Sequence, residues 1–68
     1  MTKFIILTDK INGTKLYVNP SAIQLISENQ NFAMLHLYGS QYSYIEVSES
    51  PESIMNLIRI TEEDDGLN

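Results

Sequence analysis

The chain has 68 residues, 43% of them hydrophobic, with no cysteine, four basic side chains and nine acidic ones, for a formal net charge of −5. This length provides one domain with a core near the lower size limit, which neither a disulfide nor a thiolate zinc site can reinforce. Because phosphate backbones bind clustered Lys and Arg, the four scattered bases argue against direct nucleic-acid binding, and the missing cysteines fit a cytoplasmic protein.

Residues 3–18 predict two strands joined by a tight turn. Residues 3–8 are rich in β-formers, and their apolar run Phe4–Leu7 is far too short for a signal-peptide core or for the roughly 20 residues of a membrane span. Asn12-Gly13 is the pair that supplies positive φ in hairpin turns, and residues 15–18 alternate polar with apolar side chains. We therefore expect a soluble protein with no membrane contact, whose second strand returns antiparallel to the first.

Three more strands are predicted, over residues 23–28, 32–38 and 42–47. Pro20 restricts the residue before it, so residues 19–22 are expected to form a turn or one loop of 3-10 helix. A three-residue loop at 39–41 gives the last hairpin one consistent apolar face, whereas a two-residue loop would mix the faces. The cross-strand pairs in the preferred register are Ala33–Val47, Leu35–Ile45 and Leu37–Ser43.

The only convincing helix is predicted over residues 51 to about 60. Ser50 can cap the free amides of the first turn, and Pro51 has no N–H to lose at the first helical position. Glu52 adds negative charge at the positive end of the helix dipole. The apolar stripe that should cover the open side of the sheet has i, i+3, i+4 spacing and consists of Ile54, Leu57 and Ile58.

The last eight residues have no periodicity and hold four acids, Glu62, Glu63, Asp64 and Asp65. Because the helix dipole disfavours acids at this end, we predict residues 61–68 as a disordered acidic tail and residues 1–60 as the domain. The predicted fold class is α+β, mainly β, with four to five short antiparallel strands in a meander followed by one C-terminal helix. The sequence leaves open whether the sheet curls into a small barrel.

No combination of chemically active residues stands out. His36 is the only histidine, and its strand neighbours provide neither an orienting partner nor further metal ligands. The serines lack a nucleophile-elbow context, and the three isolated glycines form no phosphate-cradling loop. Asp9, Asn12 and Gly13 lack the ligand spacing of a calcium loop. We therefore predict no catalytic, metal-binding or cofactor-binding residue, no small-molecule substrate and no enzymatic activity.

The face opposite the predicted core carries aromatic residues and methionine where a solvated sheet usually carries polar ones. These residue types are enriched at the cores of protein interfaces. We predict an interaction surface for a partner protein, for a second copy of the chain in a homo-oligomer, or for both. Its residues are Tyr17, Phe32, Met34, Tyr38, Tyr42 and Tyr44. The alternative is that a curled sheet or the helix covers this face, which would exchange core and surface.

Three segments follow one another in the order that is known from one protein family: Tyr17–Ile23, Leu37–Gly39 and Val47–Ile54. Through them, over about residues 4–60, the chain resembles the small flagellar and swarming motility proteins of the FlbD type and related short proteins of bacterial and prophage genomes. The resemblance implies a cytoplasmic accessory protein without catalytic residues. The chain departs from that pattern in a longer arm between Gly39 and Val47, and in Ile45, which replaces a common tyrosine.

Three functions are open at this point. The first is a non-enzymatic bacterial or phage accessory protein that acts through protein–protein contacts, with a motility role implied only by the resemblance. The second is a small acidic inhibitor of a nucleic-acid-binding protein, of the phage counter-defence type, whose acidic residues 62–65 would occupy a basic groove. The third is an RNA-binding regulator of the carbon-storage-regulator architecture, which the lack of basic residues near a strand edge disfavours.

Overall fold

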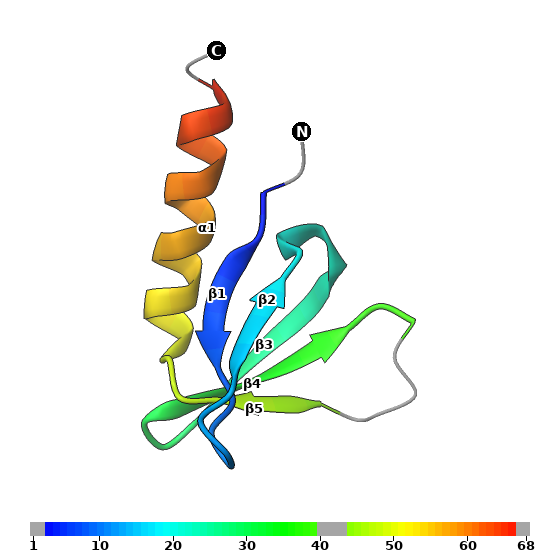
Figure 1. Cartoon of the computed structure of the whole chain (residues 1–68), viewed down its shortest axis with the longest axis vertical. Helices are drawn as coiled ribbons and strands as arrows, with labels where there is room; N and C mark the ends of the chain where they lie inside the picture. The colour runs from blue at the N-terminus through cyan, green and yellow to red at the C-terminus, as the bar shows by residue number, and fades with distance from the viewer. Residues whose placement is uncertain (1–2, 40–43, 67–68) are drawn as a thin grey trace.

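Five short antiparallel strands in two sheets precede one C-terminal helix (Figure 1). The computed structural model describes residues 3–39 and 44–66, with side chains as far as Glu62. The elements are β1 (Ile5–Thr8), β2 (Lys15–Val18), the 3-10 turn η1 (Pro20–Ala22), β3 (Ile23–Asn29), β4 (Phe32–Leu37), β5 (Ile45–Val47) and α1 (Pro51–Gly66). The predicted class, α+β and mainly β, is confirmed.

The two sheets are a β1–β2 hairpin and a β3–β4–β5 meander. They lie on opposite sides of the core, and α1 flanks both of them (Figure 1). An isolated bridge between Asp9 and Val47 connects the end of β1 to β5. Within the described residues no pairing closes the strands into a barrel, so of the two sheet forms left open by the sequence the open one is present.

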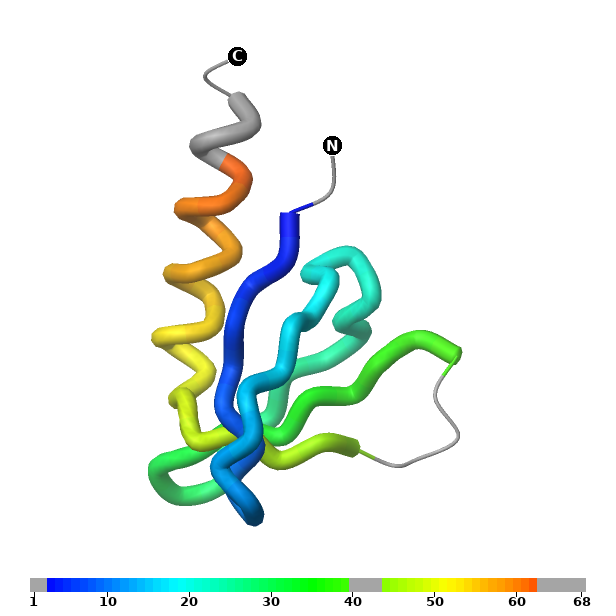
Figure 2. The backbone as a smooth tube through the Cα atoms, in the orientation of Figure 1, coloured from blue at the N-terminus to red at the C-terminus, as the bar shows by residue number. Residues whose placement is uncertain are grey.

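The turn between β1 and β2 is held by side-chain oxygens. The Asp9 carboxylate accepts hydrogen bonds from the amides of Ile11 and Asn12, at 2.8 and 3.2 Å. Asn12 in turn accepts one from the Thr14 amide, and Gly13 has the predicted positive φ, 76°. Figure 2 shows that this turn and the turn between β3 and β4 lie at the same end of the molecule, where α1 begins.

The predicted register of the last hairpin is confirmed where the structure describes it. Ala33 pairs with Val47 and Leu35 pairs with Ile45. Ala33, Leu35 and Val47 are fully buried, as a single apolar face requires. The third predicted pair, Leu37–Ser43, and part of its loop lie outside the described residues.

Strand β3 contains an irregularity that alternation alone does not predict. Its register against β4 shifts between Ile23 and Leu25, so that Ile23 pairs with Leu37 while Leu25 pairs with His36. An extra residue in one strand reverses the sides to which later side chains point. Ile23 and Ile26 therefore both pack against the core, and Leu25 points outward with 54% of its surface exposed.

Helix α1 begins as predicted. The Ser50 hydroxyl accepts a hydrogen bond from the Ser53 amide at 3.2 Å, which satisfies one free donor of the first turn. The predicted apolar stripe faces inward, with Ile54 fully buried and Leu57 and Ile58 partly buried against the core.

The predicted end of the helix at Ile60 is wrong. The backbone stays helical through Gly66, so residues 61–66, which we predicted as part of a disordered tail, belong to α1. Extending a helix costs little once its first turn has formed, and Glu is a good helix former. The Thr61 hydroxyl also donates to the Leu57 carbonyl at 2.9 Å. These local gains outweigh the unfavourable dipole at the acidic end.

The core is small and draws on both sheets and the helix. Among the residues whose side chains the structure describes, six are buried: Ile5 and Leu7 from β1, Ala33 and Leu35 from β4, Val47 from β5 and Ile54 from α1. Leu16 and Val18 of β2 pack against them from the side. Each sheet therefore has one inner face that meets the core and one outer face that points away from it.

Glu49 connects the end of β1, through hydrogen bonds, to the segment that leads into α1. Its carboxylate accepts hydrogen bonds from the Thr8 amide and the Thr8 hydroxyl, both at 2.9 Å. Backbone hydrogen bonds flank this contact, from Lys10 to the Glu46 carbonyl and from Ser48 to the Thr8 carbonyl. Together they join the two sheets where the Asp9–Val47 bridge occurs.

We expect Glu49→Ala to lower the free energy of unfolding by about 1–3 kcal/mol, because it removes both acceptors from a part-buried amide and hydroxyl. Glu49→Gln keeps the shape and one carbonyl oxygen and should cost less. Glu28→Ala is the matched control, since it removes a carboxylate from an exposed position. Urea denaturation measures all three variants. Equal stability of the Glu49→Ala variant and the Glu28→Ala control would contradict the role of Glu49.

We expect Ile54→Ala to lower the free energy of unfolding by about 2–5 kcal/mol, because it leaves a cavity among fully buried side chains. Ile60→Ala, in the same helix but exposed, should change it by less than about 1 kcal/mol. Thermal unfolding followed by circular dichroism compares the two. Equal losses would mean that α1 does not pack through the Ile54 side.

Candidate interaction surface

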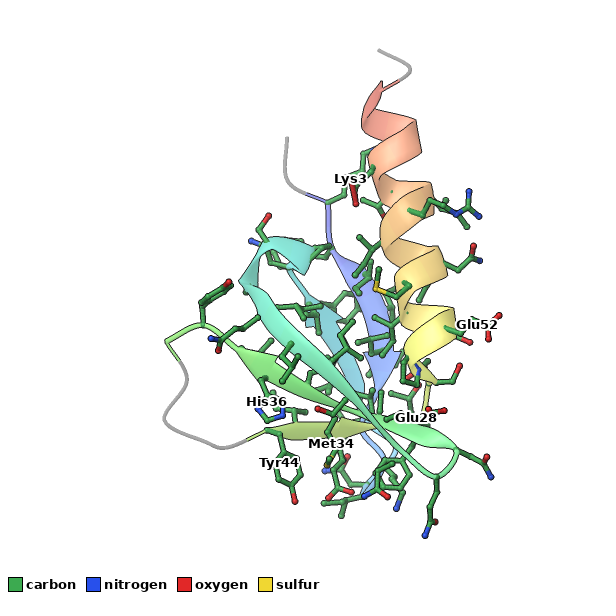
Figure 3. The ribbon with its side chains drawn as sticks, turned by 180° about the vertical axis from the view of Figure 1, so that it is seen from behind. Lys3, Glu28, Met34, His36, Tyr44 and Glu52 are labelled. Carbon is green, nitrogen blue, oxygen red and sulfur yellow. The ribbon has the colours of Figure 1, made fainter. Side chains whose placement is uncertain are left out.

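The outer face of the β3–β4–β5 sheet gathers three of the six predicted interaction residues, Phe32, Met34 and Tyr44. We define this outer face as Leu25, Phe32, Met34, His36, Tyr44 and Glu46. Met34 pairs across β4 with Ser27 on one side and Glu46 on the other. The rings of His36 and Tyr44 lie 6.1 Å apart at 46°. Figure 3, which views the molecule from behind, shows Met34, His36 and Tyr44 together over β4 and β5.

This outer face is accessible at its centre. Leu25 of β3, His36 of β4 and Tyr44, which directly precedes β5, form a row across the sheet. Leu25 and Tyr44 are 54% and 44% exposed, and His36 is half-buried. Helix α1 packs on the other side of the sheet, since Ile54 joins Leu35 in the core. The alternative in which the helix covers this face, exchanging core and surface, is therefore not found.

Phe32 occupies one end of the outer face beneath a cation. The ammonium group of Lys10, in the β1–β2 turn, lies 4.3 Å from the centroid of the Phe32 ring. Such a contact is attractive because the face of an aromatic ring is electronegative. It covers part of the ring, and Phe32 is accordingly half-buried. A partner that bound Phe32 would therefore have to displace or include Lys10.

Tyr17 does not join this group, which corrects our prediction that it shares the same face. It is 66% exposed on β2, where it pairs with the exposed Ile6 of β1. Because the inner faces of the two sheets meet at one core, their outer faces point apart. Tyr38 is exposed just beyond the end of β4, with its amide bonded to the Ala22 carbonyl. Tyr42 lies outside the described residues.

Sequence reasoning missed Leu25, which completes the outer face. The run Ile23-Gln24-Leu25-Ile26 contains three apolar residues in four positions, a pattern that strict alternation cannot place on one side. That mismatch is the signal from which the irregularity in β3 could have been found. A second exposed apolar group was also missed. It consists of Ile6 on β1, Phe4 just before that strand, and Tyr17, which pairs with Ile6 from β2.

The acidic residues predicted as a contact surface are only partly described. Glu62 is exposed on α1, while the side chains of Glu63, Asp64 and Asp65 lie outside the described residues. Across the described part of the chain, no three His, Cys, Asp or Glu side chains are grouped in a way that could hold a metal ion. Over the same residues, no helix has the length and apolar character that a membrane span needs.

Comparison with protein-family models, with curated proteins and with solved structures found no match to this chain. The resemblance to the small motility proteins therefore stays a prediction.

We expect Met34→Lys combined with Tyr44→Glu to leave the fold intact, because both side chains point away from the core. The pair leaves the net charge unchanged and places the new lysine opposite Glu46. Its cost in free energy of unfolding should stay below about 1 kcal/mol per substitution. Leu35→Glu, one residue along the same strand but fully buried, should unfold the protein. Circular dichroism decides the matter, and an unfolded double variant would place Met34 and Tyr44 in the core.

Proposed function

We propose that this protein is a non-enzymatic bacterial or phage accessory protein that works by binding another protein through the outer face of its β3–β4–β5 sheet. The observation that carries the proposal is the row formed by Leu25, His36 and Tyr44, with Met34 beside it, on a side of the sheet that α1 does not cover.

Large hydrophobic side chains are common on the surface of this small domain, and two of the exposed ones, Leu25 and Tyr44, belong to the outer face. Among the described residues, nine large hydrophobic side chains are exposed, whereas six hydrophobic side chains are buried. Scattered single hydrophobic residues on a surface are ordinary, but contiguous apolar patches usually mark a binding site. Leu25 and Tyr44 belong to one continuous row, so we treat them as part of a contiguous patch and not as scattered residues.

The chemistry of the face indicates the kind of partner. Its centre offers an aliphatic side chain, a thioether and two rings, while Glu46, Ser27 and Lys10 supply polar groups around it. Interfaces between proteins have this arrangement of an apolar centre with a polar rim. The proposed partner is therefore a protein that presents an apolar or aromatic side chain to the row between β3 and β5.

The cellular setting of this proposal comes from the resemblance described above. It suggests the cytoplasm of a bacterium, with the gene carried by the host or by a prophage, and a role connected with motility. Binding through the outer face does not depend on that setting, because it involves only residues of that face.

A photo-crosslinking amino acid at position 44 should capture the partner in cells that make the protein at its natural level. The same group at position 15, exposed on the other sheet, is the matched control. We expect a crosslinked species of defined mass from position 44, its loss when Met34→Lys is added, and none from position 15. No crosslink from position 44, or equal crosslinking from both positions, would contradict the proposal.

A further inference from the structure

A shallow groove lies along the exposed side of α1, away from the centre of the outer face. Its lining residues all belong to the helix: Glu52, Met55, Asn56, Ile58, Arg59 and Glu62. A second shallow hollow, between α1 and β3, shares Met55 and Ile58 with this groove and is otherwise lined by Pro20 and the first half of β3. Met55 is 56% exposed between the two, and Leu25 lines the second hollow at the border with the outer face. The groove therefore exposes apolar surface on an element whose opposite side is buried in the core.

The helix side of the groove has a regular charge order. Glu52, Met55, Arg59 and Glu62 follow one another at spacings of three and four residues, so they form one line along α1. An acid stands before the exposed methionine and a base stands after it. Arg59 is anchored on this side by donating to the Asn56 side chain at 2.6 Å. When two copies of this helix side run antiparallel, the acid of one copy therefore lies opposite the base of the other.

A two-fold axis through Met55 makes that complementarity explicit. Glu52 lies three residues before Met55, about 4.5 Å along the helix, and Arg59 lies four residues after it, about 6 Å. When a second helix runs antiparallel through the same axis, its Arg59 falls within about 1.5 Å of the level of Glu52. Symmetry repeats the contact, so two opposite-charge pairs flank a contact between the two methionines.

A parallel arrangement is disfavoured by the same charges. It would place Glu52 beside Glu52 and Arg59 beside Arg59, and it would bring together two helix ends that each carry four acids between residues 62 and 65. The antiparallel arrangement puts those acidic ends at opposite ends of the pair. For a second copy of this chain, the charge pattern therefore favours the antiparallel orientation over the parallel one.

We propose that a second copy of this chain binds in the groove, with the two α1 helices antiparallel about Met55. Met34, His36 and Tyr44 of the outer face do not line this groove, so the inference goes beyond the proposed function and does not require it. Exposed ion pairs contribute little and are screened by salt, so the dimer should be weak and should dissociate further at high ionic strength.

Sedimentation equilibrium of the full chain, from micromolar to millimolar concentration, tests the inference. We expect the mass to rise from 7.8 kDa towards twice that value. Arg59→Glu should weaken dimerisation by at least about tenfold, which corresponds to roughly the combined contribution expected of two lost and reversed ion pairs. Lys15→Glu makes the same charge change on exposed β2 and is the control, which should dimerise like the parent.

The sharpest test is an exchange variant, in which Glu52 and Arg59 swap their charges. Glu52→Arg alone should also weaken the dimer, and Glu52→Arg combined with Arg59→Glu should restore it, because the pairs form again with their signs exchanged. Circular dichroism checks that each variant is folded. If Glu52→Arg disturbs the start of α1, Met55→Lys serves instead. It changes the residue on the two-fold axis, leaves the Ser50 cap intact and should abolish the dimer.

Several results would overturn the inference. These are a mass that stays at 7.8 kDa throughout, equal effects of Arg59→Glu and Lys15→Glu, and an exchange variant that fails to recover. The Met34→Lys, Tyr44→Glu variant separates this inference from the proposed function. It should leave the dimer unchanged, and loss of the dimer in that variant would assign self-association to the outer face instead.

Discussion

The contact on which the rest of the structure depends is the junction of β1 with the segment that follows β5. There Glu49 accepts two hydrogen bonds from Thr8, and backbone bonds pair Lys10 with Glu46 and Ser48 with Thr8. A two-stranded hairpin is at best marginally stable alone, and the apolar face of the three-stranded meander needs cover from water. Joined at this edge, they face each other across one core. Helix α1, which starts at Pro51, two residues after Glu49, is placed where Ile54 can enter that core.

This arrangement also explains why so much apolar surface stays outside. A domain of 68 residues has a high ratio of surface to volume, so only one side of each short sheet can be buried. The buried sides meet at Leu7 and Leu35, and the opposite sides remain at the surface. On the β3–β4–β5 sheet that side carries a thioether and aromatic rings, and on α1 a methionine between opposite charges. We propose both features as contact surfaces.

Local signals in the sequence were sufficient for most of the fold. The pairing of Ala33 with Val47 follows from alternation, and the start of α1 follows from Ser50 and Pro51. What could not be predicted depends on contacts between distant residues. Thr8 and Glu49 are 41 positions apart, and no pattern connects them. The separation of Tyr17 from the outer face depends on which sides of two sheets share a core, and the irregularity near Leu25 exists because three apolar residues compete for one side of β3.

The central claim is that Met34, His36 and Tyr44 form an exposed face opposite the core in the free protein. The most direct measurement is the NMR relaxation caused by a soluble paramagnetic agent, recorded on a dilute sample. We expect strong relaxation enhancement at the Tyr44 ring and the Leu25 methyl groups and intermediate enhancement at Met34. We expect little enhancement at the buried side chains of Leu35, Val47 and Ile54. Protection of Tyr44 and Leu25 equal to that of Leu35 would contradict it.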